Sequence, residues 1–353
     1  MKKSALVLAN HSLKSPQGKT AHGLIRKCER YNIVGVIDPD SSGEDLSNFF
    51  PHARSIPVFA TVSEAIQLLK FKPDLCITGI ATHGGIIPET LKTVFVEAIC
   101  HGLSVVNSLH EHLSDNPEFT ALAQKHGVTL TDIRKSKRTR ELRFWNGEIF
   151  SVKCPIIAIL GTDCALGKRT TTQMILDSCR AEGLNAHMIY TGQTGWLQGG
   201  QYGFIFDVTP NDFVSGEIEG AILSCYRAEK PDIILIEGQS SLRNPSGPCG
   251  AEFLLSGNAK SVILQHSPRR IYYDGYENLG LKLPPIQDEI ALIRHYGAKV
   301  MAVAMNSEEM SRDEIVGEKI LLQEFAKVPV VSVLEDGADQ FLPIIRDLMR
   351  NAR

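Results

Sequence analysis

The hydrophobic residues of the first 150 positions form short aliphatic runs, and the segments between them have the spacing of amphipathic helices. The runs that predict strands are 4–10, 33–38, 73–81, 103–109 and 127–134. Segment 88–102 predicts a helix, because a proline stands at its start and a glycine at its end. Strands that alternate with helices favour a parallel sheet with right-handed crossovers. We therefore expect a Rossmann-like α/β domain in this half of the chain.

A second series of apolar runs begins at residue 155 and continues to the end of the chain. The runs that predict strands are 155–161, 186–192, 231–238, 260–267, 298–306 and 328–336. Segments 169–183 and 286–297 have helical spacing. Near-continuous aliphatic runs are typical of parallel strands that helices cover on both faces. The second half therefore predicts another α/β domain.

The junction between the two series is the basic segment 134–155, which is typical of a solvated connection. Within it, Asn146-Gly147 stands between β-like flanks and predicts a hairpin with a type I′ turn. We place a Rossmann-like domain with this terminal hairpin at 1–152, and a P-loop NTPase-like domain at 153–353.

The composition is that of a soluble globular protein, with 43% hydrophobic residues, 22% charged residues and a formal net charge of −3. This balance argues against nucleic acid or an anionic membrane as the main partner. The apolar run near the N-terminus is too short for a signal peptide, and no segment approaches the roughly 20 apolar residues that span a bilayer. The eight cysteines are scattered without zinc spacing, which fits a reducing compartment. We expect a cytoplasmic protein.

The stretch GTDCALGKRTTT at 161–172 follows an apolar strand and opens a helix, which is the context of a phosphate-binding loop. Its backbone N–H groups and the positive end of the helix dipole can hold phosphate oxygens, and its lysine can reach along a phosphate chain. The candidate phosphate-binding residues here are Gly161, Thr162, Asp163, Gly167, Lys168, Arg169, Thr170 and Thr171.

This loop departs from the usual pattern in two ways. Five residues rather than four separate Gly161 from Gly167, and Arg169 stands where a hydroxyl residue normally binds Mg²⁺. Thr170 or Thr171 can replace that hydroxyl only after a shift in helix phase. The departures weaken the case for phosphoryl transfer more than the case for phosphate binding.

Polar residues follow the strand at 231–238. Glu237 ends the strand, where the open edge of a parallel sheet binds ligands. Its carboxylate is a candidate general base, and together with Thr170 it is the candidate metal-binding pair if the protein uses Mg²⁺. Gln239, two positions further on, is a candidate substrate-binding residue.

The strand at 260–267 ends in the same way, with His266 as a second candidate general base. Arg269 and Arg270 follow, and the planar guanidinium group of arginine matches a carboxylate, so both are candidates for binding an acidic substrate. Asn306, after the next strand, is a candidate contact for a purine base.

Three other segments suggest binding. The glycine-rich segment 191–220 predicts a binding loop or lid. In the first domain, Asp38 ends a strand where a carboxylate can meet a ribose hydroxyl, and 78–88 contains His83, Gly84 and Gly85 as a candidate anion or carbonyl site. The glycine fingerprint of dinucleotide binding is absent after the first strand, so NAD binding is not supported.

Taken together, GTDCALGKRTT, PDIILIEGQSSL and LQHSPRR resemble a bacterial and archaeal family with an N-terminal Rossmann-like domain and a C-terminal phosphate-loop domain. The family includes D-glutamate N-acetyltransferases, which make N-acetyl-D-glutamate for a partner racemase of the enolase superfamily. The C-terminal half alone is also similar to dethiobiotin synthetase, in which threonine follows the loop lysine directly.

The resemblance implies an N-acetyltransferase that uses acetyl-CoA, holds its phosphates on the loop and acetylates a small acidic amino acid, D-glutamate. The alternatives are an enzyme of the dethiobiotin synthetase type that activates a carboxylate with ATP and Mg²⁺, and a nucleotide-binding regulatory switch. We expect a homo-oligomer.

Overall fold

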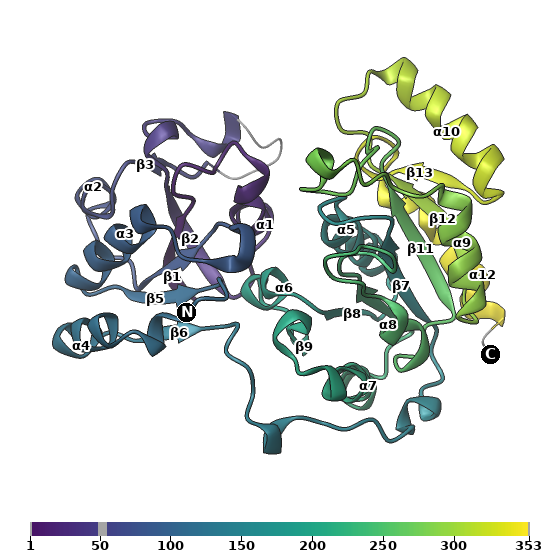
Figure 1. The fold of residues 1–353 in the computed structure, drawn as a ribbon, viewed down its shortest axis with the longest axis horizontal. Helices are drawn as coiled ribbons and strands as arrows, with labels where there is room; N and C mark the ends of the chain where they lie inside the picture. The colour runs from purple at the N-terminus through teal and green to yellow at the C-terminus, as the bar shows by residue number, and fades with distance from the viewer. Residues whose placement is uncertain (1, 49–54, 352–353) are drawn as a thin grey trace. The chain divides into compact units, whose positions relative to one another are not determined.

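The computed structural model describes residues 2–48 and 55–351. Two compact units are formed, one from Met1–Ser136 with Gln193–Gly199 and the other from Lys137–Gly192 with Gly200–Arg353 (Figure 1). No helix among the described residues is both long enough and apolar enough to cross a membrane.

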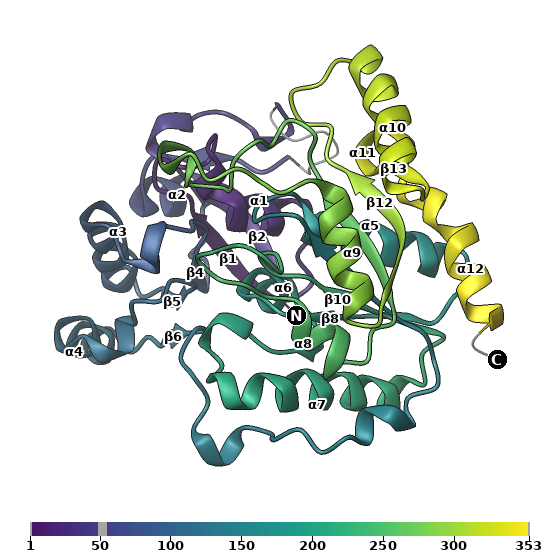
Figure 2. The same ribbon diagram turned by 45° about the vertical axis from the view of Figure 1, so that its right-hand side comes forward.

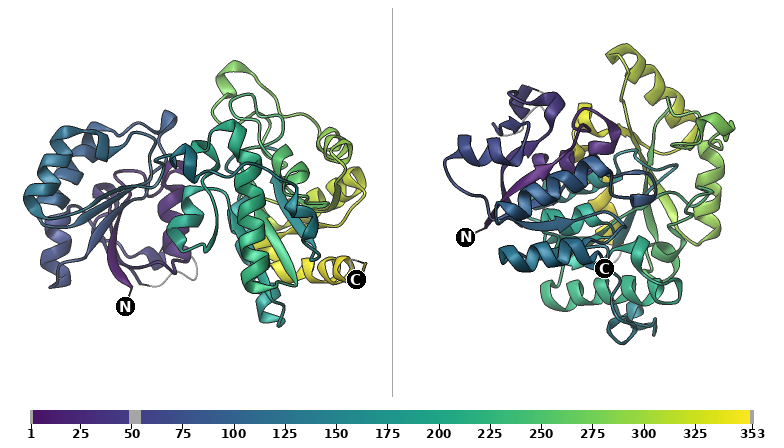
Figure 3. Two further views of the ribbon diagram at one scale, coloured as in Figure 1. Left: turned by 90° about the horizontal axis from the view of Figure 1, so that it is seen from below. Right: turned by 60° about the vertical axis from the view of Figure 1, so that its left-hand side comes forward.

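The first unit is built on a parallel sheet of six strands in the order β3-β2-β1-β4-β5-β6. The strands are β1 (Lys3–Leu8), β2 (Tyr31–Ile37), β3 (Val58–Phe59), β4 (Leu75–Thr78), β5 (Ser104–Asn107) and β6 (Leu130–Asp132). The helices are α1 (Lys19–Arg26), α2 (Val62–Leu69), α3 (Glu89–Cys100), α4 (Pro117–His126) and α6 (Gln193–Gln198). Buried residues of α2, α3 and α4 form the core on one face of the sheet, and those of α1 and α6 form it on the other (Figure 3). The predicted parallel sheet is confirmed, and β3 is an additional short edge strand.

The helix ends in this unit follow from local sequence. Helix α4 begins where the Asn116 side chain accepts hydrogen bonds from the Glu118 and Phe119 N–H groups, with Pro117 in the first turn. It ends at Gly127, which adopts the left-handed conformation. Helix α3 was correctly predicted from the same signals, because Pro88 stands just before it and Gly102 just after it.

The second unit contains a parallel sheet of seven strands in the order β13-β12-β11-β7-β10-β8-β9. Its strands are β7 (Ile156–Gly161), β8 (Ala186–Tyr190), β9 (Tyr202–Gly203), β10 (Ile233–Glu237), β11 (Ser261–His266), β12 (Lys299–Met305) and β13 (Val330–Ser332). Its helices are α5 (Lys168–Ala181), α7 (Asn211–Glu229), α8 (Ala251–Leu255), α9 (Ile286–His295), α10 (Arg312–Ala326), α11 (Val333–Asp336) and α12 (Leu342–Asn351).

Helices cover this second sheet on both faces, as its aliphatic runs predict. Buried residues of α7, α8, α9 and α10 form one core, and those of α5 and α12 form the other (Figure 2). Strand β7 lies in the middle of the sheet between β11 and β10. The carboxyl ends of these three strands therefore meet at one edge, where the candidate residues lie.

The predicted hairpin at Asn146-Gly147 is wrong. Gly147 has a left-handed φ of 84°, but the Asn146 side chain accepts a hydrogen bond from the Glu148 N–H at 3.0 Å and a 3₁₀ turn follows at Glu148–Ser151. The Glu219 carboxylate on α7 accepts the N–H groups of Asn146 at 2.8 Å and Ile149 at 3.0 Å. The sequence pattern predicts residues 137–152 as part of the first domain, but they belong to the second unit.

Segment 191–220 is not the continuous loop that its glycines suggest. It contains α6, which packs on α1 in the first unit, and the first ten residues of α7, which starts at Asn211. The Gln198 side chain on α6 donates hydrogen bonds to the carbonyls of Gly23 at 2.7 Å and Lys27 at 2.9 Å. The predicted strand 328–336 is also shorter than expected, because β13 ends at Ser332 and α11 follows.

Candidate functional site

The phosphate loop connects β7 to α5, as the motif predicts. Its backbone needs unusual conformations, with Gly167 at a φ of 99° and Ala165 at 52°. A Cβ atom on Gly161 would lie 2.9 Å from the Lys168 Cδ, so glycine at this position leaves space for the lysine. The buried Lys168 folds back over the loop, and its Nζ donates to the Asp163 carbonyl at 2.5 Å. An ammonium group and a helix N-terminus thus meet at one point, which can bind an anion.

Asp163 is fully buried and serves as an anchor for two other loops. Its carboxylate accepts hydrogen bonds from Arg270 Nη1 at 3.0 Å, Asn244 Nδ2 at 3.0 Å and the Asp274 N–H at 2.7 Å. The sequence predicts Asp163 among the phosphate-binding residues, but its carboxylate is turned to these protein donors. The contacts join the loops that follow β10 and β11 to the phosphate loop.

Arg169 forms an ion pair with Glu237 across the site. Arg169 Nη1 lies 3.0 Å from Glu237 Oε2, and the side chains are only 16% and 5% exposed. The Thr191 N–H approaches the same carboxylate oxygen at 3.4 Å. Glu237 therefore sits at the strand end as predicted, but with its charge balanced by the residue that replaces the usual hydroxyl.

The residues present do not fit a magnesium site of the usual P-loop kind. The carboxylate of Glu237 is held by Arg169, and the Thr171 hydroxyl donates to Gln265 Oε1 at 2.6 Å. Thr170 is partly buried on the first turn of α5, beside Arg169. A cation at Glu237 must displace a guanidinium group from a mostly buried position, so these residues do not offer Mg²⁺ a ready site.

His266 ends β11 beside the phosphate loop. Its Nδ1 lies 3.0 Å from the Thr162 hydroxyl oxygen, and burial lowers the pKa of the imidazole from 6.5 to about 4. The ring is therefore neutral at pH 7. Hydrogen bonding to Thr162 fixes the orientation of the ring relative to the loop.

The lowered pKa of His266 predicts a pH dependence of stability. The unfolded state binds more protons than the folded state between pH 6.5 and about 4, so stability should decrease as the pH falls through this window. From pH 7 to 5 this residue should contribute a loss of about 2 kcal/mol in the free energy of unfolding. Urea denaturation of the wild type and His266→Gln at both pH values measures the difference. His295→Gln, at an exposed histidine, is the control, and equal losses in all three proteins would contradict the assignment.

The two candidate arginines point to different partners. Arg270 pairs with Asp163 and also with Asp274, at 3.2 Å, so it lies beside the phosphate loop. Arg269 is exposed and pairs with Glu314 on α10. Of the two, Arg270 is the one that the fold brings to the site.

Gln239 and Asn306 also lie at the carboxyl edge of the sheet. Gln239 Nε2 donates to the Thr191 hydroxyl at 3.0 Å, and the same hydroxyl donates to the Glu237 carbonyl at 2.6 Å. Asn306 Nδ2 donates to the Leu166 carbonyl at 3.2 Å, which brings the end of β12 to the phosphate loop.

Sequence reasoning missed four residues that organise this edge. They are Thr191, Asn244, Gln265 and Asp274. Each is a polar residue at the carboxyl end of a strand or in the loop beyond it, and that position is the signal that could have identified them. Gln265 was the clearest, because it is a polar residue that ends an aliphatic run inside a buried strand.

The candidate residues of the first unit form hydrogen bonds with other residues of the same unit. Asp38 is 1% exposed, and its Oδ2 accepts the Leu13 N–H at 3.0 Å. Gly84 and Gly85 both have positive φ in a 3₁₀ turn at His83–Gly85, and the Gly85 carbonyl accepts the N–H groups of His110 and Glu111 at 3.0 Å. These contacts join separate loops of the unit to one another.

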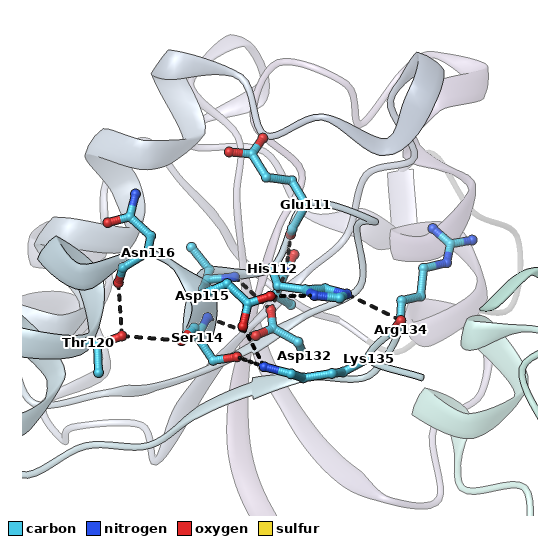
Figure 4. Close-up of polar contacts among 11 residues, drawn as sticks. Glu111, His112, Ser114, Asp115, Asn116, Thr120, Asp132, Arg134 and Lys135 are labelled. Atoms are coloured by element: carbon cyan, nitrogen blue, oxygen red, sulfur yellow. Dashed lines mark hydrogen bonds and ion pairs between the residues drawn. The ribbon is translucent and has the colours of Figure 1, made fainter. Parts of the chain in front are cut away.

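Figure 4 shows the polar network at the end of β6 in the same unit. Asp132 accepts the N–H groups of Leu113 at 2.9 Å and Ser114 at 2.8 Å, which holds the 3₁₀ turn at Leu113–Asp115 (Figure 4). His112 lies between Asp115 and the Arg134 carbonyl, at 3.0 and 3.3 Å. The network shapes the end of the sheet and contains no assigned site residue.

The fold and the site define a class of protein. A parallel-sheet unit of Rossmann-like order is joined to a second α/β unit with a phosphate loop between its central strand and α5. Residues 39–136 match the model of the DUF1611_N Rossmann-like domain, and residues 143–342 match that of the DUF1611 P-loop domain, both described as domains of unknown function. The chain belongs to the DUF1611 family, and the predicted combination of domains is confirmed.

Similar proteins support the assignment of this chain to the DUF1611 family. A DUF1611 family protein from Anabaena variabilis has a crystal structure that matches 98% of this chain and 100% of its own, with a TM-score of 0.89 and 26% identity. Two curated relatives are named D-glutamate N-acetyltransferase. The one from Pseudoalteromonas is 29% identical over 276 residues, and the one from Tritonibacter scottomollicae is 28% identical over 284 residues. In both cases 75% of this chain and 79% of the relative are covered.

Proposed function

We propose that this protein is an N-acetyltransferase that transfers the acetyl group of acetyl-CoA to the amino group of D-glutamate. The observation that carries the proposal is the Arg169–Glu237 ion pair, at 3.0 Å. With this pair in place the loop can still hold phosphates. The Glu237 carboxylate, which a magnesium ion would need, is already neutralised by Arg169. The names of the two curated relatives support the same reaction.

Acetyl transfer needs phosphate binding but no phosphoryl transfer. In the proposed reaction Lys168 and the N–H groups of the loop hold phosphates of coenzyme A. The neutral amine attacks the thioester carbonyl, a C–N bond forms, and the C–S bond then breaks. Coenzyme A leaves as a thiolate that takes up a proton. His266, which ends β11 beside the phosphate loop and is neutral at pH 7, is the proposed acceptor of the proton that the amine loses, and it passes this proton on to the thiolate.

Arg270 is the proposed contact for a carboxylate of the acidic substrate, since its guanidinium group lies beside the loop at Asp163. Gln239 is a further contact at the same edge. The N-acetylated product would be the substrate of the partner racemase that the family resemblance implies. The competing reaction, carboxylate activation by ATP and Mg²⁺, requires the ion pair between Arg169 and Glu237 to open.

The direct test is calorimetric titration of the full-length protein with acetyl-CoA, in the presence and absence of EDTA, and separately with ATP plus Mg²⁺. We expect micromolar binding of acetyl-CoA that EDTA leaves unchanged. Release of the coenzyme A thiol should then depend on D-glutamate. Metal-dependent binding of ATP together with no signal from acetyl-CoA would overturn the proposal in favour of the ATP-dependent reaction.

Replacing Arg270 should affect the amino acid far more than the acetyl donor, because Asp163 in the phosphate loop keeps its hydrogen bonds from Asn244 and the Asp274 N–H. Loss of a charged hydrogen bond costs about 2 to 3 kcal/mol, so Arg270→Ala should raise the KM for D-glutamate about 30- to 150-fold. Steady-state kinetics with each substrate varied in turn measure the effect. Arg269→Ala is the matched control, because this neighbour pairs with Glu314 and is expected to leave both KM values unchanged. An equal rise in both KM values for Arg270→Ala would contradict the role of Arg270 as a contact for the substrate carboxylate.

A further inference from the structure

Helix α10 carries large apolar side chains that the protein does not bury. Ile315, Leu322 and Ala326 face the core of the second unit. On the remaining surface of the helix, large apolar side chains are exposed, at 59% for Val316, 65% for Ile320, 47% for Leu321 and 54% for Phe325. Helix α10 packs on the same face of the sheet as α9, and Figures 1 and 2 show it near the edge strand β13. At 3.6 residues per turn, Val316 and Ile320 form one exposed apolar strip and Leu321 and Phe325 form a second, with Gly317 between the two. Exposed apolar strips on a folded domain mark a binding surface.

Gly317 lies between these two strips of the helix and is not explained by the packing of the chain. A Cβ atom built on Gly317 meets nothing within 4 Å, so the space is open, and the residue has an ordinary helical backbone. Glycine in a helix interior is less stable than alanine. Between the larger neighbours Val316 and Leu321 it creates a notch that lets another backbone approach closely.

The charges at the two ends of α10 are complementary to each other. Asp313 and Lys327 are both exposed, and neither forms an ion pair with a described residue. Each stands seven positions from Ile320 in the sequence. If two copies of the helix lie antiparallel with Ile320 at the centre, each Asp313 comes opposite Lys327 of the second copy. The helix dipoles are then also antiparallel, which is favourable.

We propose that two copies of this chain associate through α10, with the helices antiparallel and crossing at Ile320. The strips Val316–Ile320 and Leu321–Phe325 flank the contact on its two sides, Gly317 between them sets the close approach, and the Asp313–Lys327 pairs fix the direction. The helix is already held in place for this contact, because Lys319 pairs with Asp336 of α11 at 2.6 Å and Glu314 pairs with Arg269. Since symmetric pairing uses one surface twice, it closes at the dimer.

Sedimentation velocity of the full-length protein over a range of concentrations tests the pairing. The wild type should show a monomer–dimer equilibrium, and Ile320→Glu should raise the dissociation constant by at least about tenfold. Ile86→Glu is the matched control, since Ile86 lies in the first unit and is 64% exposed against 65% for Ile320. Gly317→Trp should also break the dimer, because its side chain meets open space in the monomer but fills the notch.

Charge reversal tests the antiparallel direction. Asp313→Lys and Lys327→Asp should each weaken the dimer, and the double variant should restore it. A wild type that stays monomeric at every concentration overturns the proposal, and so does a dimer that Ile320→Glu and Ile86→Glu affect equally. Failure of the double variant to recover would exclude the antiparallel arrangement. All of these results are independent of whether the protein binds acetyl-CoA.

Discussion

Replacing Lys168 by alanine is expected to weaken acetyl-CoA binding by about 30- to 150-fold, since a charge-assisted contact with a phosphate contributes about 2 to 3 kcal/mol. The ammonium group donates to the Asp163 carbonyl in the protein alone, so it is already held at the mouth of the loop. Because the lysine is 7% exposed, little ordering is required before it meets the ligand. Calorimetric titration of the variant with acetyl-CoA measures the change.

Two further variants separate the charge from the packing. Lys168→Met keeps an unbranched side chain against Gly161 and removes only the ammonium group, so it should bind acetyl-CoA as weakly as the alanine variant. Lys299→Ala removes an exposed lysine at the start of β12 and should bind like the wild type. Unchanged affinity in Lys168→Met would mean that the loop does not hold the phosphates of the ligand.

Replacing Arg169 by alanine is expected to lower the free energy of unfolding by about 3 kcal/mol, because it leaves the Glu237 carboxylate buried without its counter-charge. The carboxylate is 5% exposed, and the remaining contact from the Thr191 N–H is long, at 3.4 Å. Chemical denaturation near pH 7 measures the loss. Adding Glu237→Gln to Arg169→Ala should recover most of it, since the double variant no longer buries an unpaired charge.

An exposed ion pair provides the comparison for Arg169. Arg346 pairs with Glu182, and each side chain is 48% exposed, so Arg346→Ala should cost less than about 1 kcal/mol. If Arg169→Ala costs no more than Arg346→Ala, the pair with Glu237 is not the buried ionic contact that the proposed function relies on.

The sequence predicted the two sheets well because their strands are nearly continuous aliphatic runs. It did not predict β3 and β9, which are two residues long and exist only through pairing with a neighbouring strand. It also misjudged Asn146-Gly147, where a carboxylate on α7 far along the chain takes the N–H groups that a hairpin would have used. Local pattern fails where a distant partner decides the conformation.

The candidate site also has one part that the sequence predicts and another part that it does not. The loop from Gly161 to Lys168 is a local motif, so its backbone could be predicted from the sequence. The pairing of Arg169 with Glu237 and the anchoring of Asp163 by Asn244 and Arg270 depend on loops that only the sheet brings together. Residue type predicted that these side chains lie near the edge of the sheet, but not which of them neutralise one another.

The placement of α6 has a consequence for the order in which the protein can fold during synthesis. Leu197 on α6 is fully buried in the core of the first unit, yet it is encoded after β7, α5 and β8 of the second. The first unit can therefore not be completed when residue 136 leaves the ribosome, and it must wait for residue 199. A gene cut at the apparent boundary yields a first half without one of its helices, so the two halves are not freely exchangeable between proteins.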